Sequence, residues 1–599
     1  MVISIVQKII TFALNQVMVL STSPEVLGQA AVQLELLLST LLFLSREGIR
    51  LSTLRQSTGS SASFQSVVNI SWLPPLLVLV LSALISLLRD YFAPNYDCTV
   101  VYMYSAAAFI ECLGEPLYNM FQNVANIKPR LSAETTAVFT KSVVTVLCVA
   151  YWDLGVHGFG IAQLAYAITY VLVLCYHCLV AVRNKEVQFT GSALCCKDLL
   201  PRLIYTTNIK TGDTTNSLFG GNVLSVAATL TGSSLLKHLL TESDKIALTL
   251  SASTYNQGIY AVTNNYGSLA ARVIYLPLED SARLAFAKLS GDFKQSAQQL
   301  LPVQNNATEE KPTATGQARS IIATTQNDKE GRALQTSDCT DRLLLLKNTL
   351  TRLLRLVGFI GLFFALFGIP YVPVAVQYVL GAKWRTEETI SALRTYCIYL
   401  LVMGVNGVAE SFVQTAAPAS AFTTLNIGLI LSSLGFVAVA IPAVRRFGTS
   451  GIILANSFGM VVRIANNGAY TLKMFANPAL FFDRVSVSNE TRPVAVNDAQ
   501  AGDGLTGVTK KDLVKEVSPP LLWVVCVLAS AAVVHASAYW YAHTSRTIAH
   551  TAMHVLVGGT TAVVFLLTSL YFAPEQDVTV VVDRFPLSLQ RRFRKSKQL

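Results

Sequence analysis

Apolar runs of about 17–25 residues recur from one end of the chain to the other, separated by polar segments. A helix of that length crosses about 30 Å of hydrocarbon. The pattern therefore predicts an all-α polytopic membrane protein with about 14 transmembrane helices. The expected spans are 2–20, 28–44, 73–89, 99–120, 135–151, 156–182, 234–251, 258–286, 351–380, 388–416, 420–443, 450–474, 520–541 and 548–573.

Three polar segments, 183–217, 289–341 and 483–519, interrupt this pattern, and the last of them lies in a predicted cytosolic linker at 479–519. The first follows six spans and indicates a cytosolic linker between two lobes. The other two are rich in Thr, Gln, Asn, Gly and charged residues and hold little apolar surface, so we predict that they are cytosolic and disordered. The predicted domains are an N-terminal lobe (1–182), a C-terminal lobe (218–478), a last pair of spans (520–573) and a basic cytosolic tail (574–599).

Composition and charge agree with a membrane location. Only 14% of the residues are charged, against about 25% in soluble proteins, and the mean hydropathy is +0.48. Most Lys and Arg residues outside the expected spans fall on the side that holds both termini, which the positive-inside rule makes cytosolic. The formal net charge of +11 therefore reflects topology and attraction to anionic lipid. We expect membrane lipids as partners and no nucleic acid.

The same topology bears on N-glycosylation. Acceptor triplets begin at Asn69, Asn306 and Asn489. All three fall on the predicted cytosolic side, where no glycan is added. We therefore expect the three asparagines to be unmodified.

Nothing in the sequence indicates catalysis. The chain has no P-loop, nucleophile elbow or HExxH motif. Its ten cysteines form no CxxC pair and no metal-binding spacing with histidine. The first predicted lumenal loop, STSPEVLG, is too short to hold the acidic site of a glycosyltransferase that uses lipid-linked sugars. We therefore expect no enzyme activity, no metal and no cofactor.

One stretch, 235–288, mixes charged residues with a mostly apolar sequence. An ionisable side chain inside a bilayer costs several kcal/mol unless it is paired or faces water. The stretch therefore indicates a polar pathway inside the protein, or segments that lie partly at the interface. Its charged residues include Lys237, Glu242, Asp244, Lys245, Arg272, Glu279, Asp280 and Arg283.

Several blocks of sequence resemble one known family. They are SREGIR at 45–50, ECLGEPLYNMFQN at 111–123, IKPRLSAE at 127–134, LLKHLLTESDK at 235–245, NQGIYAVTNNYGSLAARVIYLPLEDS at 256–281, RTYCIYLLVMGVNGVAESF at 394–412 and GIILANSFGMVVRI at 451–464. Together they resemble the Rft family of oligosaccharide translocation proteins of the eukaryotic endoplasmic reticulum. The resemblance runs from about residue 7 to residue 475, and it is most specific in the 256–281 block.

The resemblance implies a fold and a role. The family is similar to the multidrug/oligosaccharidyl-lipid/polysaccharide exporters, which have two six-helix lobes in a V; here two C-terminal helices are added. It implies an endoplasmic-reticulum membrane protein that moves mannosylated chitobiosyl-pyrophosphoryl-dolichol, a dolichol-pyrophosphate-linked oligosaccharide, to the lumenal leaflet for N-glycosylation. Two alternatives are an accessory protein that binds or delivers this glycolipid without moving it, and a cation-coupled exporter of amphiphiles.

Two arginines inside apolar spans, Arg272 and Arg463, are the best candidates for binding the pyrophosphate. A guanidinium at mid-depth can bind a phosphate with two parallel hydrogen bonds. The alternative is an intramembrane ion pair that holds helices together, with Glu242 or Glu410 as the partner. Both acidic residues are also candidates for the substrate site.

Further candidates combine cations and amides. Arg46 and Arg50, at the cytosolic edge of the second span, could bind phosphate or anionic lipid, or could simply snorkel to the interface. Asn264 and Asn265 could hydrogen-bond sugar hydroxyls or could join helices. Lys237 completes the candidate substrate-binding set.

Several acidic residues also have more than one possible role. Glu35, Glu111 and Glu115 lie where cation-coupled exporters place their ion-binding acids, although Glu115, followed by proline, also fits a kink and a helix cap. Glu279 follows Pro277 and can accept from backbone amides that the proline frees or pair with Arg283 four residues on. Either contact would fix the geometry between the seventh and eighth spans.

Overall fold

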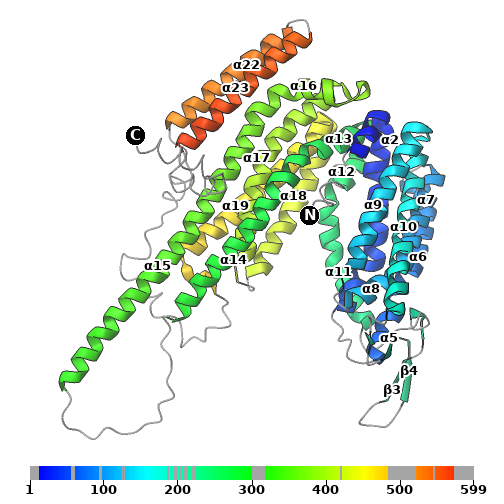
Figure 1. Ribbon diagram of the computed structural model, residues 1–599, viewed down its shortest axis with the longest axis horizontal. Coiled ribbons are helices and arrows are strands. Elements are labelled where there is room, and N and C mark those ends of the chain that lie inside the picture. Colours follow the sequence, from blue (N-terminus) through cyan, green and yellow to red (C-terminus); the bar gives the residue numbers. More distant parts are fainter. Residues whose placement is uncertain are drawn as a thin grey trace. The chain divides into compact units, whose positions relative to one another are not determined.

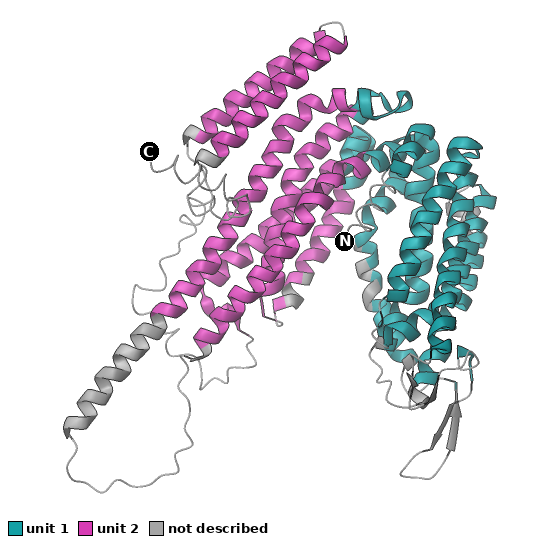
Figure 2. Ribbon diagram, in the orientation of Figure 1, with its two compact units in different colours: residues 1–262, 376–389, 440–452 teal, residues 263–375, 390–439, 453–599 magenta. Residues whose placement is uncertain are grey.

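The computed structural model describes most of the chain outside its two ends and its longest linkers. The described residues form two compact units (Figure 2). Unit 1 comprises 1–262, 376–389 and 440–452, and unit 2 comprises 263–375, 390–439 and 453–599. The domain boundaries expected from the sequence stay a prediction. The described residues are 13–54, 61–92, 97–123, 126, 128–184, 188–189, 192–193, 199–202, 204–207, 214–218, 223–299, 318–418, 421–482, 521–543 and 547–572.

Helices dominate both units (Figure 1). Within the described residues, nine helices are long and apolar enough to cross a membrane. They correspond to nine of the expected spans, and the described parts of the other five are also helical. The chain is therefore an all-α multi-pass membrane protein, and the total of 14 spans stays a prediction. The nine are Pro24–Thr53, Phe64–Leu87, Lys128–Tyr151, Gly155–Arg183, Ser337–Val379, Glu387–Ala416, Ile427–Phe447, Trp523–His543 and Ile548–Ser569.

Unit 1 begins with helical residues 13–21 and a long helix that carries two π-helical turns. Ser23 caps this long helix, since its hydroxyl accepts from the Val26 amide, and Pro24 occupies the first helical position, where it needs no amide partner. The long helix consists of α2 (Pro24–Gly28), η1 (Gln29–Leu34), α3 (Glu35–Leu42), η2 (Phe43–Glu47) and α4 (Gly48–Leu54).

In the rest of unit 1, α10 packs against α9 and α7, α6 packs against α7, and α11 packs against α4 of the long helix. Leu34, Leu38, Val100 and Tyr104 belong to a core between the long helix and α7. Positions along these helices that face the core are apolar at helical spacing, which drives this packing. The elements are α5 (Ser61–Ile70), α6 (Leu73–Phe92), α7 (Cys98–Leu113), α8 (Glu115–Asn123), α9 (Lys128–Val146), η3 (Leu147–Tyr151), α10 (Gly155–Arg183), α11 (Val223–Thr241), α12 (Ser243–Ser251) and the start of α13 (Thr254–Ala270).

The linker at 183–217 is more ordered than its polar composition suggested. It contains two antiparallel hairpins, β1 (Gln188–Phe189) with β2 (Ser192–Ala193) and β3 (Ile204–Thr207) with β4 (Thr214–Ser217). Asn69 on α5 holds this region, because its amide group donates to the carbonyls of Arg202 and Leu218, each at 2.6 Å. Asn69 is only 4% exposed, so the first glycosylation triplet is buried.

Unit 2 has an aromatic core and a C-terminal helix pair. Phe412 packs against both Phe286 and Phe475. The pair α22–α23 lies antiparallel (Figure 1), and Trp523 and Phe565 pack with Phe367. The elements are η5 (Ala271–Tyr275), α14 (Leu276–Gln299), α15 (Ala318–Phe363), η6 (Phe364–Gly368), α16 (Ile369–Val379), η7 (Ala382–Trp384), α17 (Glu387–Ala416), α18 (Phe422–Phe447), α19 (Thr449–Ala476), η9 (Pro478–Phe481), α22 (Leu521–His543) and α23 (Ile548–Phe572), of which α16–α19 and η7 lie partly or wholly in unit 1.

The predicted disorder at 289–341 is wrong at both ends of that segment. Helix α14 continues to Gln299, and α15 already begins at Ala318. The two helices pack together, and the Ser296 hydroxyl donates to Asp338 at 3.2 Å. A helix pair can bury a few apolar residues along a narrow seam, so low hydrophobicity did not exclude helical structure here. The middle of the segment, 300–317, and the whole of 483–519 lie outside the described residues.

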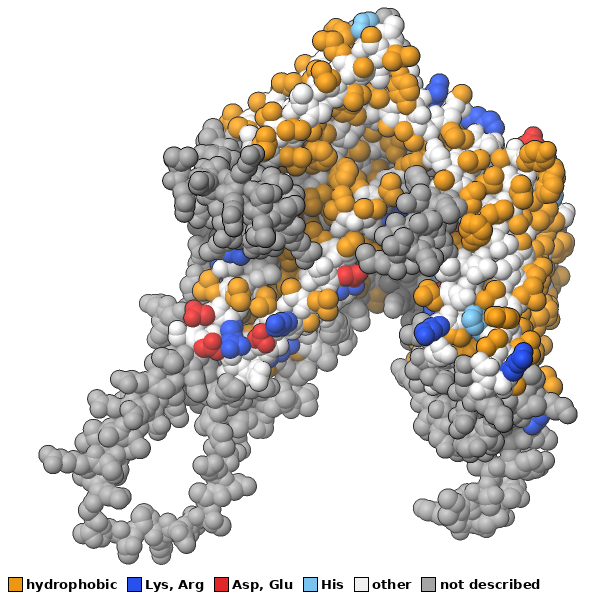
Figure 3. Space-filling model, viewed as in Figure 1, with side chains coloured by type: hydrophobic (Ala, Val, Ile, Leu, Met, Phe, Trp, Pro, Cys, Tyr) orange, Lys and Arg blue, Asp and Glu red, His pale blue; other side chains and the backbone are white. Residues whose placement is uncertain are grey.

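Large apolar side chains are exposed along the outer faces of the helices (Figure 3). Leu172 and Leu179 on α10 are 62% and 60% exposed, and Leu431 and Leu434 on α18 are each 63% exposed. In water such surfaces would be costly, whereas hydrocarbon covers them without penalty. The outward-facing apolar residues agree with the membrane location.

Candidate functional site

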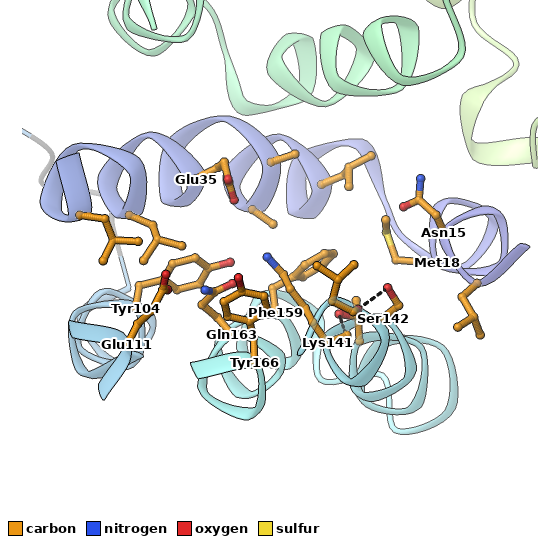
Figure 4. A pocket seen from close by; sticks show the side chains of 18 of the residues that line it. Asn15, Met18, Glu35, Tyr104, Glu111, Lys141, Ser142, Phe159, Gln163 and Tyr166 are labelled. Atoms are coloured by element: carbon orange, nitrogen blue, oxygen red, sulfur yellow. Dashed lines mark hydrogen bonds between the residues drawn. The ribbon is translucent and has the colours of Figure 1, made fainter. Parts of the chain in front are cut away.

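A cavity of about 500 Å³ lies inside unit 1 (Figure 4). Its walls come from the first helix, the long helix α2–α4, α7, α9 and α10. Although these helices are apolar on the outside, about half of the lining side chains are charged or can form hydrogen bonds. The polar lining residues are Asn15, Glu35, Arg46, Tyr104, Glu111, Lys141, Ser142, Thr145, Gln163 and Tyr166.

Arg46, which lines the cavity, is bound by two carboxylates. Its Nη1 atom lies 2.6 Å from Glu111 Oε1 and 3.6 Å from Glu115 Oε1. The π-helical turn η2 carries Arg46, and α7 carries Glu111. Glu111 is 4% exposed and Glu115 is fully buried, so these carboxylates depend on the arginines for their charge balance.

A second arginine repeats this arrangement one helical turn further on. Arg50 binds Glu115 with two hydrogen bonds, from Nε to Oε2 at 2.8 Å and from Nη2 to Oε1 at 2.5 Å. Its guanidinium also lies over the Tyr118 ring, 3.7 Å from the ring centre. Both arginine side chains are mostly buried, so neither one snorkels to the interface. The Glu115 carboxylate binds Arg50, an ion pair that its expected role as a helix cap did not include.

The spacing of these four residues explains how the pairs align. Arg46 and Arg50 are four residues apart on one helix, and Glu111 and Glu115 are four residues apart at the α7–α8 junction. Side chains four residues apart lie on the same face of a helix, which places the two arginines together; the two glutamates flank the break at Gly114 and both face the arginines. The two partners of each pair are separated by 65 residues, so no local pattern in the sequence joins them, although the equal spacing was a usable signal. We call Arg46, Arg50, Glu111 and Glu115 the charge ladder.

Three other polar groups of the cavity, Glu35, Lys141 and the Gln163 amide oxygen, form no side-chain hydrogen bond or ion pair among the described residues, and Lys141 Nζ lies 6.0 Å from the Tyr166 ring centre. Gln163 on α10 is 2% exposed, and its Oε1 atom is buried without a hydrogen bond. No ion pair is formed by Glu35 or by Lys141 within the described part of the chain. Figure 4 shows Glu35 pointing from one wall toward Lys141, Gln163 and Tyr104 on the opposite wall. These groups are available to a ligand.

The candidates Arg272, Asn264 and Asn265 lie together in unit 2. Arg272, in the π-helical turn η5, donates from Nη2 to the Asn265 carbonyl at 2.8 Å. The Tyr396 hydroxyl donates to Asn264 Oδ1 at 3.0 Å. Arg272 is exposed, and Tyr396 packs where Gly267 leaves room, since a Cβ there would meet its ring at 2.3 Å. Asn264 therefore joins α13 to α17, as one of its two readings expected.

Arg463 and Glu410 occupy unit 2 without contacting each other. Arg463 on α19 is half-buried, and its Nε atom has no hydrogen-bond partner among the described residues. Glu410 accepts from Asn406 at 3.2 Å and from Gln414 at 2.8 Å on its own helix. Within the described residues Glu410 therefore pairs with neither arginine, and the ion-pair alternative is wrong for this residue.

The acidic residues near the seventh and eighth spans also differ from expectation. Glu242 Oε2 lies 3.0 Å from Lys245 Nζ, so its ion pair is local and is made with neither Arg272 nor Arg463. Glu279 does not pair with Arg283. Arg283 instead lies 3.7 Å from Asp280 Oδ1 and donates to the Ser411 hydroxyl at 3.3 Å. The Glu279 carboxylate lies against Gly407, which leaves space for it.

Two further sequence-based expectations concern Lys237 and metal binding. Lys237 lies on α11, and its side chain is outside the described residues. No group of three or more His, Cys, Asp and Glu side chains that could hold a metal ion occurs in the part of the chain that the structure describes. The groups assembled here can bind a ligand by hydrogen bonds and charge, and whether the candidates contact a substrate stays a prediction.

Comparisons with known proteins support the fold and the family. Mouse "Man(5)GlcNAc(2)-PP-dolichol translocation protein RFT1" is 28% identical over 483 residues, covering 78% of this chain and 79% of the mouse protein. The protein of the same name from Schizosaccharomyces pombe is also 28% identical, with 76% of this chain and 78% of that protein covered. The solved structure of lipid II flippase MurJ, in an inward closed conformation, aligns with 94% of this chain and 98% of its own at a TM-score of 0.52 and 12% identity, which shows the fold.

The family assignment rests on a match over almost the whole chain. The profile described as Rft protein matches residues 1–581, which includes the last two helices that the sequence blocks did not reach. The resemblance noted from those blocks is thereby confirmed. This chain belongs to the Rft protein family.

Proposed function

We propose that this protein moves mannosylated chitobiosyl-pyrophosphoryl-dolichol from the cytosolic to the lumenal leaflet of the endoplasmic-reticulum membrane for N-glycosylation. Family membership supports the proposal, because relatives are named for translocating Man(5)GlcNAc(2)-PP-dolichol. The structural observation that carries it is a polar cavity of about 500 Å³ within helices whose outer faces are apolar.

The chemistry of the head group explains why a protein is needed. Its pyrophosphate and many hydroxyls would each lose hydrogen bonds to water on entering hydrocarbon, at a cost of several kcal/mol per group. Side chains that replace those hydrogen bonds lower the barrier. Arg463 keeps a guanidinium nitrogen buried and unpartnered in an apolar helix, which suits it to bind an anionic group. The polyprenyl tail can remain in the lipid throughout.

The proposed role requires no covalent chemistry. We propose that the protein is not an enzyme and that it needs no cofactor, since moving a lipid between leaflets breaks no bond. Both termini are proposed to face the cytosol, the side that the distribution of Lys and Arg favours. The bound partners are the dolichol-linked oligosaccharide and the surrounding lipids.

Reconstitution of the purified full-length protein tests the proposal. Vesicles containing defined lipid-linked oligosaccharide are made with wild-type protein, with the Arg463→Ala variant or without protein. A membrane-impermeant glycosidase or lectin added outside reports the fraction of glycolipid that reaches the outer leaflet. We expect wild-type protein to expose the inner pool and Arg463→Ala to slow this step.

The outcomes separate the alternatives. If wild-type protein binds the glycolipid but leaflet exchange is no faster than in protein-free vesicles, the protein is an accessory that holds or delivers its ligand. If exchange requires an imposed cation gradient and small amphiphiles compete with the glycolipid, the protein is a cation-coupled exporter of amphiphiles. Either result would reject intrinsic, uncoupled flipping.

A further inference from the structure

The charge balance of the cavity in unit 1 suggests which part of a glycolipid it suits. Its four charged lining residues, Glu35, Glu111, Arg46 and Lys141, sum to no net formal charge. The Arg46 guanidinium is already bound by two carboxylates. A pyrophosphate would need an excess of positive charge, whereas a free metal cation would need an excess of negative charge without a lysine in the wall. The cavity offers neither.

The hydrogen-bonding groups and aromatic rings of the lining point to a ligand rich in hydroxyl groups. The Gln163 amide oxygen is buried and unpartnered, although buried polar groups nearly always have a partner in folded proteins. Glu35 and Lys141 add an acceptor and a donor, and the rings of Tyr104, Phe159 and Tyr166 supply flat apolar faces (Figure 4). A sugar ring complements these groups. Its hydroxyls both donate and accept hydrogen bonds around its edge, and its C–H groups can pack on the aromatic faces.

The cavity is also of a suitable size. Sites for small molecules have volumes of about 300–1,000 Å³, and this cavity of about 500 Å³ falls within that range. An acyl or prenyl chain would leave Glu35 and the Gln163 amide oxygen without hydrogen bonds, which is unfavourable for groups shielded from water.

We infer that the cavity of unit 1 is a carbohydrate subsite, which binds uncharged sugar residues of the oligosaccharide head group through Gln163, Glu35 and Lys141. The Tyr166 hydroxyl, which also lines the cavity, adds one hydrogen bond to the sugar. The identity of the sugar rests on the proposed function, while the chemical class of the ligand rests on the cavity. The pyrophosphate and the lipid are bound elsewhere or remain in the membrane.

The inference is tested by binding of the free oligosaccharide Man(5)GlcNAc(2), which lacks both pyrophosphate and lipid, to the purified full-length protein in detergent. Binding is measured by calorimetry or by saturation-transfer NMR. The variants are Gln163→Leu, Tyr166→Phe and Glu35→Gln. Tyr176→Phe is the matched control, because Tyr176 lies on the same helix but is 63% exposed and does not line the cavity.

We expect the wild-type protein to bind the free oligosaccharide, and Gln163→Leu and Tyr166→Phe each to weaken binding by about two- to tenfold, the loss typical of one hydrogen bond. Tyr176→Phe should bind as the wild type does. Gln163→Leu should unfold at the same temperature as the wild type or higher, because it removes a buried polar atom that has no partner. That result separates a binding role from a structural one.

Several results would overturn the inference. One is the absence of oligosaccharide binding by wild-type protein, and another is binding that Gln163→Leu and Tyr166→Phe both leave unchanged. Inorganic pyrophosphate that displaces the oligosaccharide would also overturn it, as would sodium chloride alone stabilising the protein in a Glu35-dependent way while oligosaccharide does nothing. Cavity-dependent sugar binding together with failed leaflet exchange would instead support the subsite and reject the flippase proposal.

Discussion

The bidentate pair between Arg50 and Glu115 should be a major contributor to the stability of unit 1. Glu115 is fully buried and the Arg50 side chain is 14% exposed, so removal of either partner leaves a charge in a poorly hydrated place. We predict that Glu115→Leu and Arg50→Met each destabilise the protein strongly. The double variant Arg50→Met/Glu115→Leu should be much more stable than either single variant.

The magnitude follows from the cost of an unpaired buried charge. Breaking a buried pair on one side costs about 3–5 kcal/mol, whereas replacing both partners by apolar residues is often neutral. In Glu115→Leu the Arg50 guanidinium keeps its cation–π contact with Tyr118, whose ring centre is 3.7 Å away in the wild type. This contact offsets about 0.5–2 kcal/mol of the lost stability. Arg46 also loses its contact with Glu115 at 3.6 Å. We therefore expect a net loss of about 2–4 kcal/mol for this variant.

The assay is the thermal unfolding midpoint of purified variants in detergent, supported by their abundance in cells. Glu134→Gln is the control, because the Arg130–Glu134 pair has a similar length, 2.9 Å, but its side chains are 44% and 39% exposed. An exposed pair contributes about 0–1 kcal/mol, so the midpoint should barely move. If Glu115→Leu behaves like Glu134→Gln, or if the double variant is no better than the worse single variant, the reasoning from burial is refuted.

Three further predictions concern other parts of the chain. Arg463→Ala should impair glycolipid handling more than Arg463→Lys, since lysine keeps the charge but loses bidentate binding, and full N-glycosylation in cells carrying normally expressed Arg463→Ala would contradict this. Gly558→Ala should lower stability by about 1–3 kcal/mol, because the added Cβ would lie 2.2 Å from the Tyr371 hydroxyl, whereas Gly559→Ala meets nothing within 4 Å and should be tolerated in the same unfolding assay. Endoglycosidase should not shift the protein on a gel, and a glycan at Asn69 or at either of the other two triplets would overturn the predicted topology.

Much of the helical architecture could be predicted from the sequence, because the membrane imposes a strong local signal. Only helices satisfy every backbone hydrogen bond within one segment, so the apolar runs alone identified spans such as 388–416, which the structure gives as Glu387–Ala416. Breaks within helices were harder to foresee. The 99–120 span is divided at Gly114, beside the kink that Glu115 and its following proline suggested, whereas no local pattern marked the interruption of the 234–251 span at Glu242.

The candidate site was less predictable, since it depends on contacts between distant segments. Arg46 and Arg50 were identified as candidates, but their carboxylate partners were considered only as ion-binding or capping residues. Lys141 and Gln163 were not singled out at all. Each is a lone polar residue on an apolar helix, and no local pattern distinguishes one that lines a cavity from one that faces a neighbouring helix. Their role appears only when α9 and α10 pack side by side.

The charge ladder also has a consequence for biosynthesis. The partners in each of its pairs are 65 residues apart, so the arginines are made well before the glutamates. At a synthesis rate of about 5–20 residues per second, Arg46 and Arg50 are made about 3–13 s before the glutamates that pair with them. During that interval two guanidinium groups need water, lipid phosphate or a membrane chaperone. Nascent chains stalled just before Glu111 should therefore crosslink to insertion factors through this helix, and chains long enough for Glu111 and Glu115 to have left the ribosome should lose that crosslink.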